Sequence, residues 1–89
     1  NAQTRAAFVA RLESLGNRGV RALPSEANFV LAIFPDQATA ERVRDAIADA
    51  GYAVRHLPGQ GLGDALRITI GRKDDMAKVG DAIEAALGN

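Results

Sequence analysis

The sequence predicts an α+β domain, in which a small mixed β-sheet carries helices packed on one face. Two observations predict this class. Short stretches with strand-like patterning alternate with longer stretches of helical periodicity, and one of the strand candidates is apolar almost throughout. The chain has 89 residues, which is enough for one domain and one modest core. We therefore expect residues 1–89 to form a single domain.

Three stretches show the three-and-four spacing of an amphipathic helix, over residues 2–15, 37–50 and 74–87. Gly16 is expected to end the first helix with a left-handed cap, and Asp36 is a suitable N-cap for the second. The apolar stripes that should face the core comprise Phe8, Val9, Leu12, Leu15, Ala40, Val43, Ile47, Ala50, Met76, Val79, Ile83 and Leu87.

The remaining positions of two helices carry further expectations. Arg5, Arg11 and Glu13 fall off the apolar stripe of the first helix and are interpreted as a solvated face. Gly80 lies on the apolar side of the last helix, where its lack of a side chain would let a neighbouring backbone approach closely.

The first half of the sheet is predicted from residues 20–23 and 28–34. The first segment is short and stops at a proline, whereas the second is nearly continuous in apolar residues. Continuous apolarity is typical of a central strand that is covered on both faces. A right-handed crossover through the helix at 37–50 should make the strand at 28–34 parallel to the next strand, at 52–57.

The second half of the sheet is predicted as an antiparallel pair of strands, at 52–57 and 66–70, joined by the glycine-rich loop 58–64. The last strand alternates strictly, so that one leucine and two isoleucines face the core while Arg67 and Thr69 face outwards. Counting in twos along the preceding strand places Arg55 on the same outward face.

Two arginines side by side on neighbouring strands repel each other unless an anion lies between them. Guanidinium groups suit this task because each offers paired donors to a carboxylate or phosphate. From the residues alone, Arg55 and Arg67 are therefore either an anion site or two solvated side chains.

Few groups in the chain are suited to catalysis. His56 is the only histidine, and we interpret it as a hydrogen-bonded structural residue. The chain has no cysteine, and one histidine with scattered carboxylates does not predict a metal site. The glycines of loop 58–64 precede a strand rather than a helix, which argues against a nucleotide-binding loop.

The composition of the chain excludes some classes of binding partner. The formal net charge is zero and aromatic residues make up 4%, so that we expect neither nucleic acid nor a membrane surface as a partner. The longest apolar run, residues 29–34, is too short to span a bilayer. The N-terminus lacks an initiator methionine and shows no signal peptide, which leads us to expect a piece of a longer, cytoplasmic chain.

Three blocks carry a resemblance to a known family: Pro-Ser-Glu-Ala-Asn-Phe-Val-Leu at 24–31, Gly-Tyr-Ala-Val-Arg at 51–55 and Leu-Arg-Ile-Thr-Ile-Gly at 66–71. In this order they resemble the C-terminal small domain of fold-type I aminotransferases, and most closely that of histidinol-phosphate aminotransferases. The resemblance covers essentially the whole chain. It implies the small domain of a longer, homodimeric enzyme that uses pyridoxal 5'-phosphate.

The resemblance also implies roles for three residues. Arg67 would grip the anionic end of the substrate, Arg55 would contact its phosphate, and Asn28 would stand at the rim of the same cleft. The full enzyme would move an amino group between glutamate and imidazole-acetol phosphate in histidine synthesis. Neither Lys73 nor Lys78 has the desolvated pocket that a cofactor-binding lysine needs, so the resemblance implies no catalytic, cofactor-binding or metal-binding residue in this chain.

Three alternatives remain open at this point. One keeps the family but changes the reaction, to an aromatic amino-acid aminotransferase or a pyridoxal-phosphate decarboxylase. Arg67 is expected in all of these, whereas Arg55 favours a phosphorylated substrate. The second is an ACT-like regulatory module that binds an amino acid, and the third is a plain interaction or structural domain.

Overall fold

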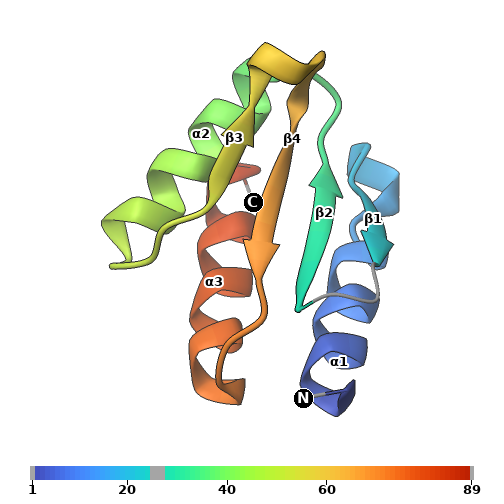
Figure 1. The fold of residues 1–89 in the computed structure, drawn as a ribbon, viewed down its shortest axis with the longest axis vertical. Coiled ribbons are helices and arrows are strands. Elements are labelled where there is room, and N and C mark those ends of the chain that lie inside the picture. The colour runs from blue at the N-terminus through green and yellow to red at the C-terminus, as the bar shows by residue number, and fades with distance from the viewer. Residues whose placement is uncertain (1, 25–27, 89) are drawn as a thin grey trace.

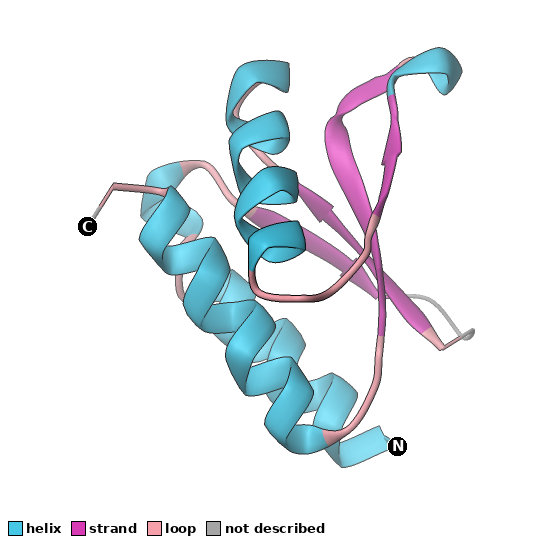
Figure 2. Cartoon of the chain, turned by 90° about the vertical axis from the view of Figure 1, so that its left-hand side faces the viewer, coloured by secondary structure: helices cyan, strands magenta, loops and turns pink. Residues whose placement is uncertain are grey.

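The computed structural model describes residues 2–24 and 28–88, in which three helices cover one face of a four-stranded sheet (Figure 1; Figure 2). The helices are α1 (Ala2–Glu13), α2 (Gln37–Asp49) and α3 (Lys73–Ala86). The strands are β1 (Arg21–Pro24), β2 (Phe29–Ile33), β3 (Arg55–Leu57) and β4 (Leu62–Thr69). The α+β class and the single helical layer are therefore confirmed.

The strands lie in the order β1-β2-β4-β3, and each neighbouring pair is antiparallel. The predicted mixed sheet is therefore wrong in its pairing. β2 and β3 run in the same direction, as the crossover through α2 requires, but β4 lies between them. The crossover leaves one strand position vacant, and the last strand of the chain returns to fill it. β2 is central, as predicted.

The hairpin formed by β3 and β4 differs from its predicted bounds. β4 starts at Leu62 rather than Leu66, and β3 is limited to Arg55–Leu57. A one-turn 3-10 helix, Pro58–Gln60, and Gly61 with a φ of 73° make the turn between them. The glycine-rich segment is therefore partly strand, because its residues from Leu62 onwards pair with neighbouring strands.

The end of α1 was also predicted imprecisely. A 3-10 turn, Gly16–Arg18, follows the helix, and the left-handed residue is Gly19 with a φ of 83°, not Gly16. Leu15, directly before this turn, packs in the core, where it is 9% exposed. The predicted N-cap of α2 is confirmed, because the Asp36 carboxylate accepts a hydrogen bond of 2.8 Å from the backbone N–H of Thr39.

The core lies between the sheet and the helices. Its largest fully buried side chains are Phe34, Leu12, Ile47, Leu66, Ile68, Ile83, Val20, Val30 and Val43. The core-facing alternation of the last strand is thus confirmed. Within the predicted helical stripes, Ala50 is exposed because α2 ends before it, and Val9 and Leu87 are only partly buried.

The other face of the sheet is not covered by any described helix (Figure 2). On β2, Val30 and Ala32 are fully buried towards the helices, whereas Phe29, Leu31 and Ile33 are partly buried on the outer face. The strand's unbroken apolarity predicted cover on both faces, but the described residues supply it on one. We call the outer surface of β1, β2, β3 and β4 the open sheet face.

Candidate functional site

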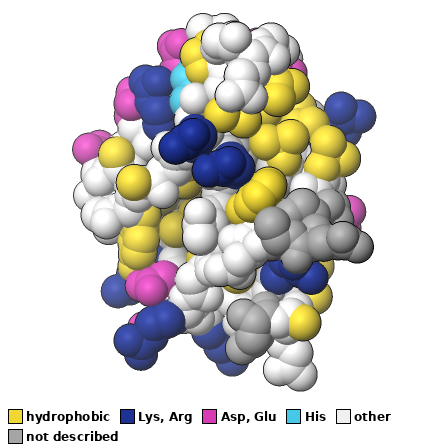
Figure 3. All heavy atoms as spheres, viewed as in Figure 1, with side chains coloured by type: hydrophobic (Ala, Val, Ile, Leu, Met, Phe, Trp, Pro, Cys, Tyr) yellow, Lys and Arg dark blue, Asp and Glu magenta, His cyan; other side chains and the backbone are white. Residues whose placement is uncertain are grey.

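The two arginines predicted to share a face do so. Arg55 on β3 and Arg67 on β4 are direct cross-strand partners in the sheet register, so their side chains leave the sheet on the same side. Arg55 is exposed and Arg67 is partly buried. In Figure 3, which looks onto the open sheet face, basic side chains lie beside hydrophobic ones.

The register extends this pair into a row that crosses all four strands. Leu23 on β1 is opposite Leu31 on β2, Leu31 is opposite Arg67, and Arg67 is opposite Arg55. One half of the row is therefore apolar and the other half is basic. Leu23 is 49% exposed and stands out as a large hydrophobic side chain open to solvent.

Arg67 also contacts an aromatic ring. Its guanidinium carbon lies 5.1 Å from the centroid of the Phe29 ring, which is within the range of a cation–π interaction. Among the described residues, no carboxylate forms an ion pair with Arg67 or Arg55. The face therefore presents two cationic groups whose N–H donors are available to an anion from outside the described chain.

Asn28 is not brought to the arginines. Its side-chain Nδ2 donates to the Ile70 carbonyl at 3.1 Å, and its own carbonyl accepts from the Ile70 N–H at 3.0 Å. These bonds place it at the end of the ladder between β2 and β4, three residue pairs from Arg67. The structure thus gives Asn28 a role in closing the sheet, and its implied contact with a ligand stays a prediction.

His56 is held by two hydrogen bonds. Its Nε2 is 2.7 Å from the Gly63 carbonyl oxygen, and its Nδ1 is 3.2 Å from Nη1 of Arg44 on α2. Because the guanidinium can only donate, Nδ1 accepts and Nε2 carries the proton that is donated to Gly63. The ring therefore joins the β3–β4 hairpin to α2, which agrees with its interpretation as a structural residue.

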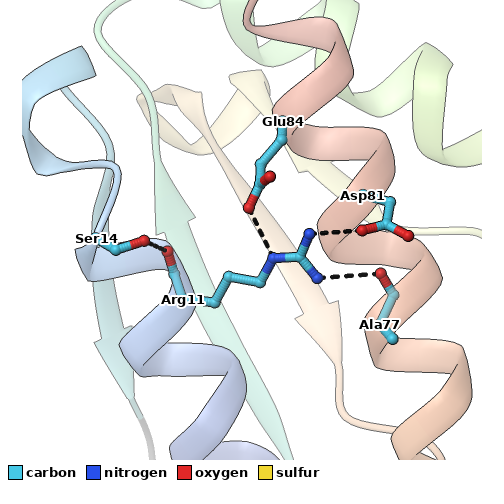
Figure 4. A network of polar contacts seen from close by, with 5 residues as sticks. All are labelled: Arg11, Ser14, Ala77, Asp81 and Glu84. Carbon is cyan, nitrogen blue, oxygen red and sulfur yellow. Dashed lines mark hydrogen bonds and ion pairs between the residues drawn. The ribbon is translucent and has the colours of Figure 1, made fainter. Parts of the chain in front are cut away.

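Sequence reasoning missed a cluster between α1 and α3, shown in Figure 4. Arg11 donates from Nε to Glu84 at 2.8 Å, from Nη2 to Asp81 at 2.6 Å and from Nη1 to the Ala77 carbonyl at 3.2 Å. Its assignment to a solvated face is therefore wrong. The hydrogen bond that Glu84 accepts from Arg11 lowers the pKa of Glu84. The hydrogen bonds that Arg11 donates to Glu84 and then to Asp81 raise the pKa of Arg11.

Gly80 explains how the guanidinium fits. A Cβ at this position would lie 2.5–2.8 Å from atoms of the Arg11 guanidinium. The prediction that a backbone approaches Gly80 is therefore wrong, because the close neighbour is the side chain of Arg11. Arg11 on α1 thus bonds to three acceptors on α3 and fits into the space beside Gly80. It joins the two helices, and its role is structural.

A groove of about 780 Å³ lies between α1 and the first turn of α3. Its lining includes Phe8, Met76 and Lys73, and it contains neither Arg55 nor Arg67. Lys73 at this groove and Lys78 further along α3 are both exposed, so neither has the desolvated surroundings of a lysine that forms a Schiff base.

No group of three or more histidine and carboxylate side chains is arranged to hold a metal ion within the part of the chain that the structure describes. Among the helices that the structure describes, none has the length and apolarity that crossing a membrane requires.

Comparison with known proteins gives consistent results. The family model for aminotransferase class I and II matches residues 2–83. A histidinol-phosphate aminotransferase from Sphingopyxis alaskensis is 53% identical over 87 residues, which are 98% of this chain and 24% of that protein. Another, from Erythrobacter litoralis, is 53% identical over 79 residues, or 89% of this chain and 22% of that protein.

A solved structure agrees. A Burkholderia pseudomallei protein described as an aminotransferase superposes with a TM-score of 0.67 and 32% identity, over 96% of this chain and 26% of that one. The chain thus spans about a quarter of the length of the relatives that it matches. The fold, the family model and these relatives together show that this chain belongs to the class I and II aminotransferases.

Proposed function

We propose that this chain is the substrate-binding small domain of a pyridoxal-phosphate-dependent histidinol-phosphate aminotransferase. The observation that carries the proposal is the cross-strand pair of Arg55 and Arg67 on the open sheet face of an aminotransferase chain. Relatives with 53% identity that are named histidinol-phosphate aminotransferase support this choice of substrate. Family membership also disfavours the ACT-like module and the plain structural domain.

In this proposal the two arginines bind and orient the anionic groups of the substrate. Each guanidinium offers two parallel N–H donors to a carboxylate or phosphate, and this geometry fixes direction as well as charge. Two such groups on adjacent strands suit a substrate that carries more than one anionic oxygen. Bringing an anion between them also relieves the repulsion between like charges.

The cofactor would be held by another part of the longer enzyme. Pyridoxal 5'-phosphate supplies an electron sink and is bound through a lysine, and the two lysines of this chain do not fit that role because both are exposed on α3. The 89-residue chain by itself is therefore proposed to be catalytically inactive. The amino transfer, between glutamate and imidazole-acetol phosphate, belongs to the whole enzyme.

The proposal also includes an interface between this domain and the rest of the enzyme. The open sheet face would dock against the large domain of the same enzyme, because its apolar half exposes Leu23 and partly exposes Leu31. The basic half of the same row would then border the cleft between the domains. A homodimeric, cytoplasmic parent enzyme completes the proposal.

The test is Arg67→Ala in the longer enzyme. Losing a charge-assisted hydrogen bond of about 1.5–3 kcal/mol should raise the KM for the phosphorylated substrate by about ten- to a hundredfold. The absorbance of the bound cofactor should remain, because Arg67 is proposed to contact the substrate alone. Steady-state kinetics and an absorbance spectrum measure the two quantities.

Two further variants sharpen this test. Thr69→Ala, on the same face of β4, is the matched control and should leave KM near its starting value. Arg55→Ala should raise KM for the phosphorylated substrate more than for an aromatic amino acid, if Arg55 meets the phosphate. An unchanged KM in Arg67→Ala would contradict the proposed function.

A further inference from the structure

We propose that Phe29 is a positioning residue, whose ring holds the Arg67 guanidinium in the orientation that binds an anion. The inference rests on the proposed function of Arg67 and adds to it the residue that sets the arginine's geometry. A long arginine side chain on an open sheet face samples many rotamers, and restricting them costs conformational entropy when a ligand binds. A ring that already restricts the guanidinium in the free protein reduces this entropy cost of ligand binding.

The register of the sheet places the ring within reach. Phe29 on β2 is opposite Thr69 on β4, and Arg67 lies two residues before Thr69, on the same outer face. Phe29 and Arg67 are therefore diagonal neighbours, and diagonal pairs are within reach of aromatic and long side chains. The separation of 5.1 Å between the Arg67 guanidinium carbon and the ring centroid is within the range of a cation–π contact.

A stacked contact, which the proposal requires, would leave the donors of the arginine available. Stacking uses the flat face of the guanidinium, whereas its five N–H groups lie around the edge, in the plane. A carboxylate or phosphate approaches in that plane. Phe29 and an anion can therefore occupy Arg67 together without competing for the same atoms.

The strand order places Phe29 and Arg55 on opposite sides of Arg67, and both favour the same position of its guanidinium. β4 lies between β2 and β3, so Phe29 and Arg55 flank Arg67 on opposite sides. Without a ligand, Arg55 repels the Arg67 guanidinium from the β3 side. Attraction to the Phe29 ring acts from the β2 side, and the two forces favour the same placement over β2. An incoming anion thus meets the two guanidinium groups already apart.

The first measurement is the NMR shift of the Arg67 side-chain protons in the 89-residue chain. Protons above an aromatic face are shifted upfield by its ring current, so these signals report the contact directly. Phe29→Leu should remove the upfield shift, and Phe29→Tyr should keep it, because tyrosine retains the ring. Circular dichroism of both variants checks that the fold is intact. An upfield shift that persists in Phe29→Leu would overturn the inference.

The second measurement is the KM for the phosphorylated substrate in the longer enzyme. Phe29→Leu should raise KM about two- to fivefold with little change in kcat, and Phe29→Tyr should restore it. In an Arg67→Ala background, Phe29→Leu should have no further effect, because its influence passes through the arginine. Ile33→Leu, on the same face of β2, is the control for altered packing and should leave KM unchanged.

The outcomes separate the two proposals. If Arg67→Ala leaves KM unchanged, the proposed function of Arg67 fails, and this inference fails with it. If Arg67→Ala raises KM but Phe29→Leu does not, Arg67 keeps its function and only the role of Phe29 is lost. If Phe29→Leu raises KM equally with and without Arg67, the ring acts through packing and the inference is again wrong.

Discussion

Gly80 and Arg11 show how one missing side chain decides a contact between helices. The guanidinium of Arg11 occupies the space in which a Cβ of residue 80 would lie, and from there it reaches Glu84 and Asp81 on the same helix. Glycine in a helix interior is normally a cost of about 0.5–1 kcal/mol relative to alanine. At this position the cost is offset by the three hydrogen bonds that Arg11 makes.

This arrangement predicts an inverted effect for Gly80→Ala. In most helix interiors the substitution stabilises, but here the new methyl group displaces the Arg11 guanidinium from its acceptors. Because those ion pairs are partly exposed, the net effect should be a destabilisation of up to about 1 kcal/mol. In an Arg11→Ala background the clash is gone, and Gly80→Ala should then stabilise by up to about 1 kcal/mol. Urea unfolding of the four proteins gives the free energies.

The sign change between the two backgrounds is the critical result. If Gly80→Ala has the same effect with and without Arg11, the guanidinium is not what excludes a side chain from this position. Ala85→Gly, on the exposed side of α3, is a control for helix propensity alone and should destabilise equally in both backgrounds.

At this scale, sequence reasoning succeeded where the information was local. The shared face of Arg55 and Arg67 follows from the period of two in their strands, and the register confirms it. Arg11 was misjudged because its acceptors are 66–73 residues away in the chain. The contact between Phe29 and Arg67 depends on β2 pairing with β4, and local patterning contains nothing that specifies that pairing.

The Arg11 cluster between α1 and α3 makes the free energy of unfolding depend on pH. Arg11 lowers the pKa of Glu84 below its ordinary value of 4.5, so that the unfolded chain takes up a proton more readily than the folded one. The contribution of the Glu84 carboxylate to stability is therefore complete at pH values above 4.5. It is lost as the pH falls through the lowered pKa of the folded state. As the pH falls from about 5 through that lowered pKa, the chain should lose more free energy of unfolding than Glu84→Gln does.

Unfolding curves measured at several pH values test this expectation. Glu13→Gln, at an exposed position on α1, serves as the control and should follow the unsubstituted chain. If the free energy of unfolding depends on pH equally in Glu84→Gln and in the unsubstituted chain, the ion pair does not stabilise the contact between the two helices.

The elements themselves were predicted better than their pairing. All three helices and the central position of β2 follow from periodicity and from continuous apolarity, and Asp36 identified the start of α2. The sheet was predicted as mixed because a crossover through a helix was assumed to join neighbouring strands. Whether such a crossover skips a position depends on which strand fills the gap, and here that strand comes much later in the chain.

At the scale of the whole molecule, the open sheet face is the feature that the isolated chain leaves unexplained. Leu23 and its neighbours on β2 form an apolar surface beside the two arginines, and the relatives are about four times as long as this chain. The proposed docking against the large domain makes a differential prediction. Leu23→Asp should cost the 89-residue chain about 0.5 kcal/mol or less, because the side chain is already half exposed.

In the longer enzyme the same substitution would bury a charge in the interface and should cost about 1–3 kcal/mol. Thermal unfolding of both proteins measures the difference. Ala48→Asp, at an exposed position on α2, is the matched control and should have similar effects in both. If Leu23→Asp costs the same in the chain and in the longer enzyme, the open sheet face does not dock there.

The position of β4 also has a consequence for synthesis. β3 is translated before the strand that pairs with it, and β2 has only β1 as a partner until β4 arrives. While the ribosome is still adding residues 62–69, both inner edges of the unfinished sheet have unpaired backbone groups. The sheet therefore closes in one late step, and a nascent chain that stops short of Thr69 has two strands separated by the gap that β4 should fill.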